Sequence, residues 1–127
     1  MNLALDTSAY SEFMRGDRSR GYQIQSARSI VVPLIVLGEL RGGFLIGSRS
    51  AQNEQTLQNF LNEPRVGILV PDDMTSHLYA HLFSQLRKQG TPLPTNDIWI
   101  AALVLQHNLV LCTSDRHFDH IPQLPRC

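Results

Sequence analysis

The sequence of 127 residues contains only two cysteines, Cys112 and Cys127, one lysine and one tryptophan. Two cysteines make no disulfide framework, which excludes a small disulfide-stabilised scaffold. The longest uninterrupted apolar run, Ile98–Leu105, has eight residues, whereas a membrane helix needs about 20. The first residues form no basic and apolar leader, because the acidic Asp6 comes almost at once. These absences predict a cytoplasmic protein with no membrane partner.

The composition is that of an ordinary globular chain. Hydrophobic residues make up 43% of the sequence and charged residues 17%, values that exclude a disordered or fibrous protein. A chain of this length folds by default as one domain that buries roughly two-thirds of its unfolded surface. No internal repeat, low-complexity tract or linker divides the sequence, so we expect a single domain over residues 1–127.

The basic residues are unevenly distributed, although the formal net charge is zero. All but one of them are arginines, and six arginines lie between Phe13 and Asn53, where only Asp17 and Glu39 are acidic. Arginine suits bidentate recognition of phosphate, and a local positive excess is a feature of nucleic-acid-binding proteins. The same excess also occurs on ordinary solvated faces, so both interpretations stay open.

Short apolar runs alternate with segments of helical pattern along the chain. Each run is aliphatic or β-branched and is bounded by polar or turn residues, as buried parallel strands are. Strands separated by helices predict an α/β domain, with a mostly parallel central sheet of about four to five strands and helices on both faces. The predicted strands are Leu3–Leu5, Ile30–Val32, Gly67–Val70 and Leu109–Cys112, and the predicted helices are Ser8–Arg15, Arg18–Ala27, Leu34–Ile46, Ala51–Asn62, Met74–Lys88 and Asp97–His107.

Two acidic residues follow the ends of predicted strands, Asp6 directly and Asp115 after Thr113-Ser114, and ligands bind at such ends in folds of this class. Asp6 comes after the first strand and can cap the next helix, because a short carboxylate accepts hydrogen bonds from the free N–H groups there. Thr7 or Ser8 can fill the same role, which would leave Asp6 free to point into a cleft. Asp115 follows the last strand and has the same two interpretations, a cap of a short turn or a ligand in a cleft.

Two further acids lie in nearly all-apolar helices. Glu39 is the only ionisable side chain in the segment Ile30–Leu40. A helix that is apolar on nearly every face is expected to be buried, so Glu39 needs either an arginine partner or a cation. Asp97 lies in the first turn of the last predicted helix, which Thr95 or Asn96 can cap. The helix dipole alone is a sufficient reason for a carboxylate at that position.

Each of these acids has a structural explanation of its own, but together they form a pattern. Carboxylates brought together from several elements are the hard oxygen ligands that Mg²⁺ or Mn²⁺ prefers, and such cations support phosphodiester cleavage. The spacing of the histidines, by contrast, matches no structural zinc site. The sequence therefore predicts a divalent cation site formed by Asp6, Glu39, Asp97 and Asp115.

Four segments resemble the motifs of the PIN-domain ribonucleases, and within these the VapC-type toxins of bacterial toxin–antitoxin pairs. The segments occur in the family's order from residue 6 to residue 122 and span nearly the whole chain. One such segment is a weak signal, whereas four in register are specific. They are Asp6-Thr7-Ser8, Val36-Leu37-Gly38-Glu39-Leu40-Arg41-Gly42-Gly43, Asn96-Asp97-Ile98-Trp99-Ile100-Ala101-Ala102 and Thr113-Ser114-Asp115-Arg116-His117-Phe118-Asp119-His120-Ile121-Pro122.

The resemblance implies a PIN-like three-layer sandwich and a metal-dependent endoribonuclease with Mg²⁺ or Mn²⁺ as its cofactor. Asp6 and Asp97 are expected to hold the cation, with Asp115 and Glu39 completing its shell directly or through water. The cation would lower the pKa of a water molecule and stabilise charge on the scissile phosphate. Either Glu39 or Asp115 would orient that water, and one or two cations are compatible with the sequence. Preference for RNA over DNA rests on the resemblance, because attack by water does not use the 2′-hydroxyl.

The resemblance also implies partners: an RNA substrate, a second copy of the chain, and an inhibitory antitoxin that joins it in a hetero-oligomer on operator DNA. The sequence disfavours three alternative functions. A phospho-accepting signalling domain needs a lysine near the end of the last strand, but the sole lysine, Lys88, lies mid-chain. A phosphatase with an aspartate nucleophile needs a second aspartate where Ser8 stands. A non-catalytic PIN scaffold that binds RNA or a partner protein is disfavoured by the presence of all four acids.

Overall fold

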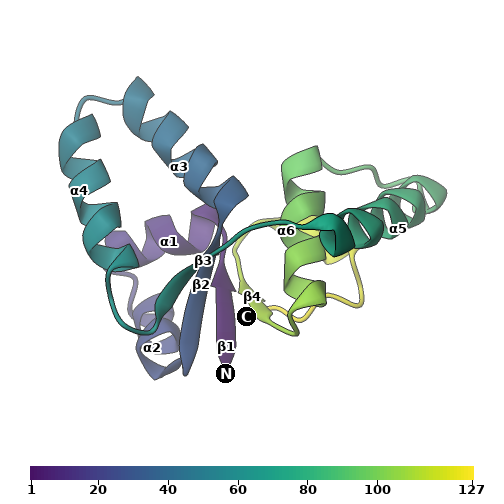
Figure 1. Cartoon of the computed structure of the whole chain (residues 1–127), viewed down its shortest axis with the longest axis horizontal. Coiled ribbons are helices and arrows are strands. Elements are labelled where there is room, and N and C mark those ends of the chain that lie inside the picture. Colours follow the sequence, from purple (N-terminus) through teal and green to yellow (C-terminus); the bar gives the residue numbers. More distant parts are fainter.

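The computed structural model describes residues 1–127 and consists of a central sheet with helices on both of its faces (Figure 1). Its strands are β1 (Asn2–Leu5), β2 (Ser29–Pro33), β3 (Val66–Leu69) and β4 (Val110–Cys112). Its helices are α1 (Thr7–Met14), α2 (Arg18–Ser26), α3 (Leu34–Ile46), α4 (Ser50–Leu61), α5 (Asp73–Gln89) and α6 (Thr95–Gln106), followed by the short 3₁₀ helix η1 (Arg116–His120). The strand order is β3-β2-β1-β4, and every neighbouring pair is parallel.

The predicted α/β architecture is confirmed, and every predicted strand and helix is present within two residues of its expected ends. Local signals explain the agreement. Helix α5 begins with a capping box, in which the Asp72 side chain accepts from the Thr75 backbone and the Thr75 hydroxyl accepts from the Asp72 backbone. It ends at Gly90, whose φ of 74° favours glycine. Every helix is too short or too polar to span a lipid bilayer.

Alternate residues of β1 face two separate hydrophobic clusters. Leu3 and Leu5 pack with Ala9 of α1 and Ile24 of α2 on one face of the sheet. Ala4 belongs to the larger cluster, to which α3, α4, α5, α6 and η1 contribute. Because β1 is an interior strand enclosed on both faces, its carboxyl end is a fixed point from which the following residue, Asp6, projects.

Helix α3 departs from the expectation of a fully buried helix. Val36, Leu37 and Leu40 are buried, but Leu34 in the same apolar segment is 46% exposed, and in the last turns Leu45 and Ile46 are 78% and 90% exposed. Helices α3 and α4 form a hairpin that rises from one end of the sheet (Figure 1). The last turns of α3 therefore have no second layer to pack against, and apolar composition alone misjudged their burial.

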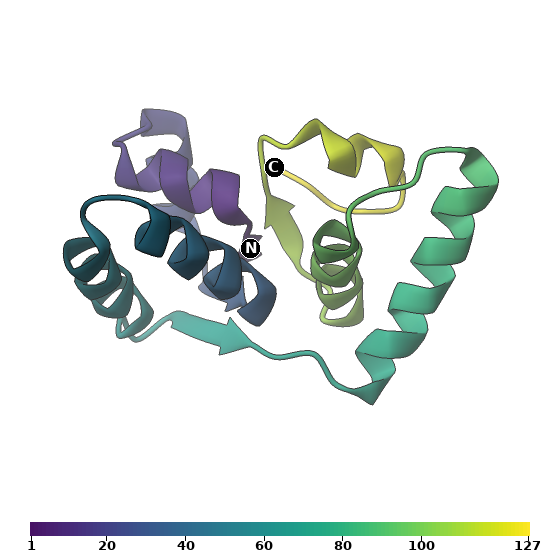
Figure 2. The same ribbon diagram turned by 90° about the horizontal axis from the view of Figure 1, so that it is seen from above.

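Helix α6 begins without the predicted side-chain cap. Pro94 occupies the N-cap position and makes no side-chain hydrogen bond, while its carbonyl accepts from the Asp97 amide at 3.1 Å. The prediction of a Thr95 or Asn96 cap is wrong, because the fixed backbone of Pro94 already directs the chain into the helix. Asp97 lies in the first turn, as predicted. Helix α5 packs on the outer side of α6, away from the sheet (Figure 2).

Candidate active site

The four predicted acids line one open cavity of about 320 Å³. Asp6 follows β1 and Asp115 lies three residues beyond β4, whereas Glu39 lies on α3 and Asp97 on α6. Parallel neighbouring strands end at the same edge of a sheet, which explains why Asp6 and Asp115 meet although 109 residues separate them in the sequence. The structure thus brings together all four side chains that the sequence singled out.

Asp6 both caps helix α1 and lines the cavity, so its two sequence interpretations hold together. Its Oδ1 accepts hydrogen bonds from the Ala9 amide at 2.8 Å and from the Ser8 hydroxyl at 2.7 Å. Its Oδ2 accepts from the Thr113 hydroxyl. The side chain is only 4% exposed. Burial raises the pKa of the Asp6 carboxyl above its ordinary value, although the hydrogen bonds from Thr113, Ala9 and Ser8 oppose the shift.

Thr113 connects the two strand-end acids. While its hydroxyl donates to Asp6, the same oxygen accepts a hydrogen bond from the Asp115 amide at 2.9 Å. Asp115 then caps η1, because its Oδ1 accepts from the His117 amide at 2.9 Å. One hydroxyl group thereby fixes the backbone of Asp115 relative to the carboxylate of Asp6.

Glu39 is half-buried and has no arginine partner, so the salt bridge that the sequence left open is absent. Its Oε1 accepts from the Thr7 hydroxyl at 2.8 Å, and its Oε2 accepts from the Asn96 amide group at 3.2 Å. Both donors are neutral, so neither contact pairs Glu39 with a cation. Its position follows from α3, which begins directly after β2 and brings Glu39 to Thr7, two residues beyond β1.

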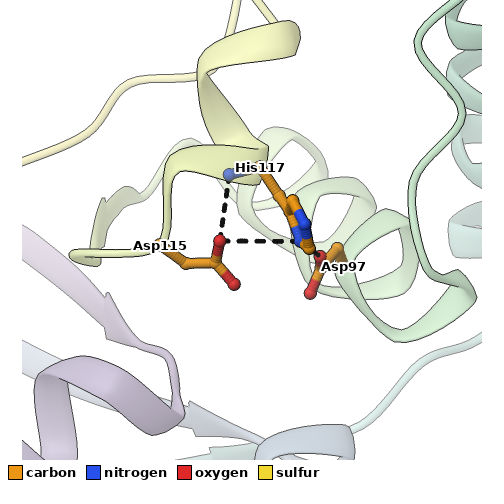
Figure 3. A group of neighbouring side chains, drawn as sticks. All are labelled: Asp97, Asp115 and His117. Atoms are coloured by element: carbon orange, nitrogen blue, oxygen red, sulfur yellow. Dashed lines mark hydrogen bonds and ion pairs between the residues drawn. The ribbon is translucent and has the colours of Figure 1, made fainter.

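Asp97, Asp115 and His117 form a group whose potential ligand atoms all lie within 4.8 Å of one another (Figure 3). Nδ1 of His117 lies 2.9 Å from Oδ2 of Asp97 and 3.5 Å from Oδ1 of Asp115. The pKa of the Asp97 carboxyl is raised by burial, while the His117 hydrogen bond opposes the shift and the charges of Asp115 and Glu39 add to it. Without a cation, this cavity therefore holds its negative charge at a cost in free energy.

The donor set fits a small divalent cation. No hydrogen bond reaches Oδ1 of Asp97 or Oδ2 of Asp115, although every other carboxylate oxygen of the four acids is engaged. Figure 3 shows these two free oxygens pointing away from the His117 ring. Hard carboxylate oxygens with open coordination positions are what Mg²⁺ and Mn²⁺ bind.

Sequence reasoning did not assign His117, Glu12 or Arg15 to the site. Glu12 and Arg15 line the same cavity from α1, and Arg15 is its only cationic residue. A signal for both was present, since Ser8, Glu12 and Arg15 have the spacing of one helix face directly after Asp6. His117 lies two residues after Asp115, a spacing that carries no metal signature on its own.

Comparison with known proteins gives a consistent result over almost the whole chain. Residues 3–124 match the PIN domain family. A protein named ribonuclease VapC4 from Mycobacterium tuberculosis is 32% identical over 108 residues, which are 85% of this chain and 78% of that protein.

Solved structures agree in fold. A structure of VapBC-1 from nontypeable Haemophilus influenzae has a TM-score of 0.88 and 26% identity, and covers 100% of this chain and 97% of that one. VapBC2 from Rickettsia felis, bound to a DNA fragment from its promoter, has a TM-score of 0.87 and 25% identity, with 100% and 98% coverage. The predicted three-layer arrangement is therefore that of these proteins.

Proposed function

This chain belongs to the PIN domain family and, within it, to the VapC-type ribonucleases, and from this premise we propose that it is a Mg²⁺- or Mn²⁺-dependent endoribonuclease, the toxin of a toxin–antitoxin pair. Its substrate is RNA, which it cleaves in the cytoplasm by hydrolysis of phosphodiester bonds. The domain that carries this activity spans residues 1–127. A four-carboxylate site performs the chemistry, with Asp6, Glu39, Asp97 and Asp115 as catalytic residues.

One observation carries the proposal: the neighbouring acids Asp97 and Asp115 each keep one carboxylate oxygen without a hydrogen-bond partner, in an open cavity lined by five acids. Structural acids are normally paired or solvated, and like charges in one partly buried site destabilise the fold. Such an arrangement is typical of functional sites, where a ligand compensates for the repulsion.

The proposed mechanism assigns a task to each side chain. Asp6, Glu39, Asp97 and Asp115 would hold the cation, which when bound supplies positive charge at the scissile phosphate and makes water a stronger acid. Thr113 holds the Asp6 carboxylate and the Asp115 backbone in fixed relative positions through its hydroxyl group. Glu39 or Asp115 accepts the proton of the attacking water, because both line the cavity with carboxylate oxygens.

Cleavage of RNA by the purified chain tests the function. We expect cleavage of a single-stranded RNA in millimolar Mg²⁺ or Mn²⁺ and none in excess chelator, with activity restored when metal is returned. A DNA oligonucleotide of the same base sequence serves as the matched substrate. An RNA that is bound but never cut, at any concentration of either metal, would support the non-catalytic scaffold instead.

The proposal includes two protein partners. One is an antitoxin that inhibits the toxin, and the other is a second copy of the toxin, which forms a homodimer with the first. In its solved structure, VapBC2 from Rickettsia felis is bound to a DNA fragment from its promoter. We extend operator binding, by a toxin–antitoxin hetero-oligomer, to this protein. A homodimer is supported by Ile68 in the edge strand β3, Val70 directly after it and Met74 in the first turn of α5, which are 49%, 57% and 57% exposed. Exposed apolar side chains gathered in one stretch of the chain are typical of an interface.

We expect the antitoxin to place a cationic side chain in the acidic cavity. Arg15 is the only cationic residue that lines this cavity, beside five acids of which only Glu12 pairs with an arginine, Arg20. An arginine from the partner therefore gains charge-assisted hydrogen bonds and excludes the cation. RNA cleavage should therefore be suppressed in the purified complex and restored when that arginine is replaced by alanine. A complex that cleaves RNA as fast as the free toxin contradicts this inhibition mechanism.

A further inference from the structure

Arg20 is a buried arginine for which the proposed mechanism has no use. It lies on α2, outside the cavity, and is only 8% exposed. Removing a guanidinium group from water is costly in free energy unless its donors are paired. What Arg20 contacts therefore shows why the fold keeps a charge at this position.

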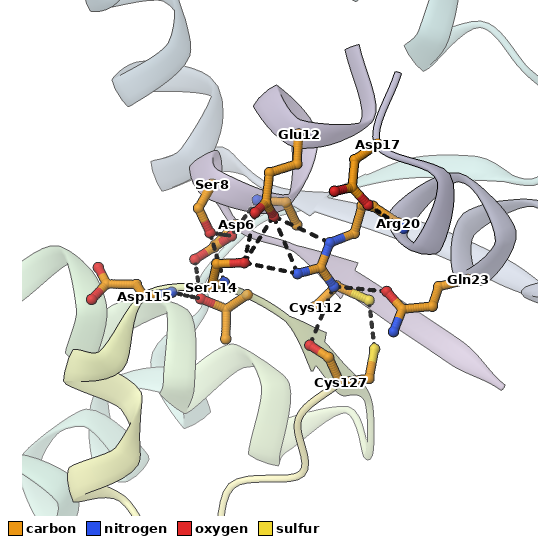
Figure 4. A network of polar contacts seen from close by, with 12 residues as sticks. Asp6, Ser8, Glu12, Asp17, Arg20, Gln23, Cys112, Ser114, Asp115 and Cys127 are labelled. Atoms are coloured by element: carbon orange, nitrogen blue, oxygen red, sulfur yellow. Dashed lines mark hydrogen bonds and ion pairs between the residues drawn. The ribbon is translucent and has the colours of Figure 1, made fainter. Parts of the chain in front are cut away.

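The guanidinium group holds together segments that are far apart in the sequence (Figure 4). Nε and Nη2 of Arg20 donate to Oε1 of Glu12 on α1 at 3.3 and 3.2 Å. Nη2 also donates to the Ser114 hydroxyl at 3.1 Å, and Nη1 donates to the Cys127 carbonyl at 3.3 Å. Gln23 accepts a further hydrogen bond from Nη1 at 2.8 Å. All parts of the arginine fork are engaged.

Ser114 lies at the centre of this arrangement. Its hydroxyl accepts from Arg20 and donates to Glu12, with Oε2 at 2.7 Å. Its backbone amide donates to the Ser8 hydroxyl at 2.9 Å, and that hydroxyl donates to Asp6. Ser114 stands between Thr113, which binds Asp6, and Asp115. Two side chains of α1 thus fasten the loop that carries Asp115.

We propose that Glu12, Arg20 and Ser114 are positioning residues that clamp the 113–115 loop against α1 and so set the place of Asp115 relative to Asp6. This inference rests on the proposed function and deepens it. Although Glu12 lines the cavity with the other acids, its carboxylate is committed to Arg20 and Ser114 and is not a fifth ligand of the cation. The clamp acts only through the acids that it places.

Geometry favours arginine over lysine at position 20. The planar fork reaches Glu12, Ser114, Gln23 and the Cys127 carbonyl at once, whereas an ammonium group is a point charge with three donors. Arg20→Lys therefore keeps the charge that neutralises Glu12 but loses part of the clamp. This variant separates the effect of charge from the effect of position.

The test measures two properties of the full chain and its variants: Mn²⁺ binding, and the kcat and KM of RNA cleavage. Electron paramagnetic resonance of free Mn²⁺ monitors the binding. Arg20→Gln, Ser114→Ala and Glu12→Gln are each expected to weaken Mn²⁺ binding or lower kcat by about 10–100-fold, with KM within twofold of the wild-type value. Arg20→Lys should give a smaller loss. The double variant Glu12→Gln/Arg20→Gln, which leaves no unpaired charge, should lose no more than either single variant.

Arg41→Gln is the matched control, because Arg41 pairs with Glu54 in a half-exposed ion pair outside the cavity. It should bind Mn²⁺ as the wild type does. A loss confined to Glu12→Gln would identify Glu12 as a metal ligand and overturn the clamp. Unchanged Mn²⁺ binding and kcat in folded Arg20→Gln and Ser114→Ala would overturn it as well.

Hydrogen exchange in the metal-free protein distinguishes failure of the clamp from failure of the proposed function. The Ser114 and Asp115 amides, which donate to Ser8 and Thr113, should exchange at least about tenfold faster in Arg20→Gln but not in Arg41→Gln. A wild-type chain that neither binds Mn²⁺ nor cuts RNA refutes the function, whatever the exchange result. Unchanged exchange in Arg20→Gln refutes the clamp, whatever the activity.

Discussion

Replacing Asp97 by asparagine is expected to lower RNA cleavage on the order of 10²-fold or more and to relieve the growth arrest caused by expression of the wild-type chain alone. The substitution keeps the shape of the side chain but removes a negative charge and one of the two free carboxylate oxygens. It also alters the contact between Asp97 Oδ2 and Nδ1 of His117, 2.9 Å apart, which helps to hold His117 beside Asp115. Cleavage rates at saturating Mg²⁺ and growth curves after induction measure the two effects.

Asp119→Asn is the matched control, because Asp119 lies on η1 close to the site, pairs with Arg126 and does not line the cavity. It should cleave RNA and arrest growth as the wild type does. Equal growth arrest by the wild type and Asp97→Asn at matched protein levels would exclude the carboxylate site as the cause of toxicity. Loss of arrest with full RNA cleavage would separate toxicity from the nuclease activity.

The fold was predictable because local signals and packing agree. The strands are short and aliphatic, and the helices between them begin or end at recognisable residues such as Asp6, Asp72 and Gly90. A fold can be predicted from its sequence where the local conformational preferences agree with the global structure. The strand-end acids were predictable for a related reason, since a parallel sheet gathers the residues that follow its strands at one edge.

Burial of α3 was not predictable from its composition. Hydrophobicity reports what a helix is able to bury, but whether Leu45 and Ile46 are covered depends on how far the α3–α4 hairpin extends beyond the sheet. The prediction of the cap of α6 was wrong for a different reason. Capping preferences favour Thr95 or Asn96, whereas Pro94 begins the helix and Asn96 donates to Glu39 instead.

The residues that support the acids were beyond sequence reasoning because their partners are distant in the chain. Arg20 meets Ser114 across 94 residues, and His117 meets Asp97 from another helix. Nothing in the pattern near Arg20 distinguishes it from the other arginines between Phe13 and Asn53. Charge and spacing identify residues that end elements, whereas pairing between side chains emerges only from the fold.

The metal-free wild-type protein is expected to be destabilised by its own site. The potential ligand atoms of Asp97 and Asp115 lie within 4.8 Å of each other. Two negative charges at that distance repel by about 3 kcal/mol at an effective dielectric constant near 20, before solvent and proton uptake reduce the cost. The pKa values of Asp6 and Asp97 are raised above the ordinary 3.8, chiefly by burial. The native state therefore binds protons more tightly than the unfolded state, and stability falls as pH rises from that ordinary value through the raised ones.

Asp97→Asn in chelator should therefore unfold at the same temperature as the wild type or higher at neutral pH, although it loses a helix-dipole interaction worth roughly 0.3–1 kcal/mol. Its melting temperature should also fall less steeply with rising pH, because one of the two titrating carboxyls is gone. A cation at ten times its dissociation constant raises the free energy of unfolding of the wild type by about 1.4 kcal/mol and its melting temperature by roughly 5 °C. The variant should gain less.

If Asp97 were only a helix-end charge, its removal would instead destabilise the protein and leave the metal response intact. Thermal melting of both proteins across pH, in chelator and in millimolar Mg²⁺ or Mn²⁺, separates these cases, because a shared carboxylate site requires that the variant be at least as stable as the wild type without metal and respond less to metal.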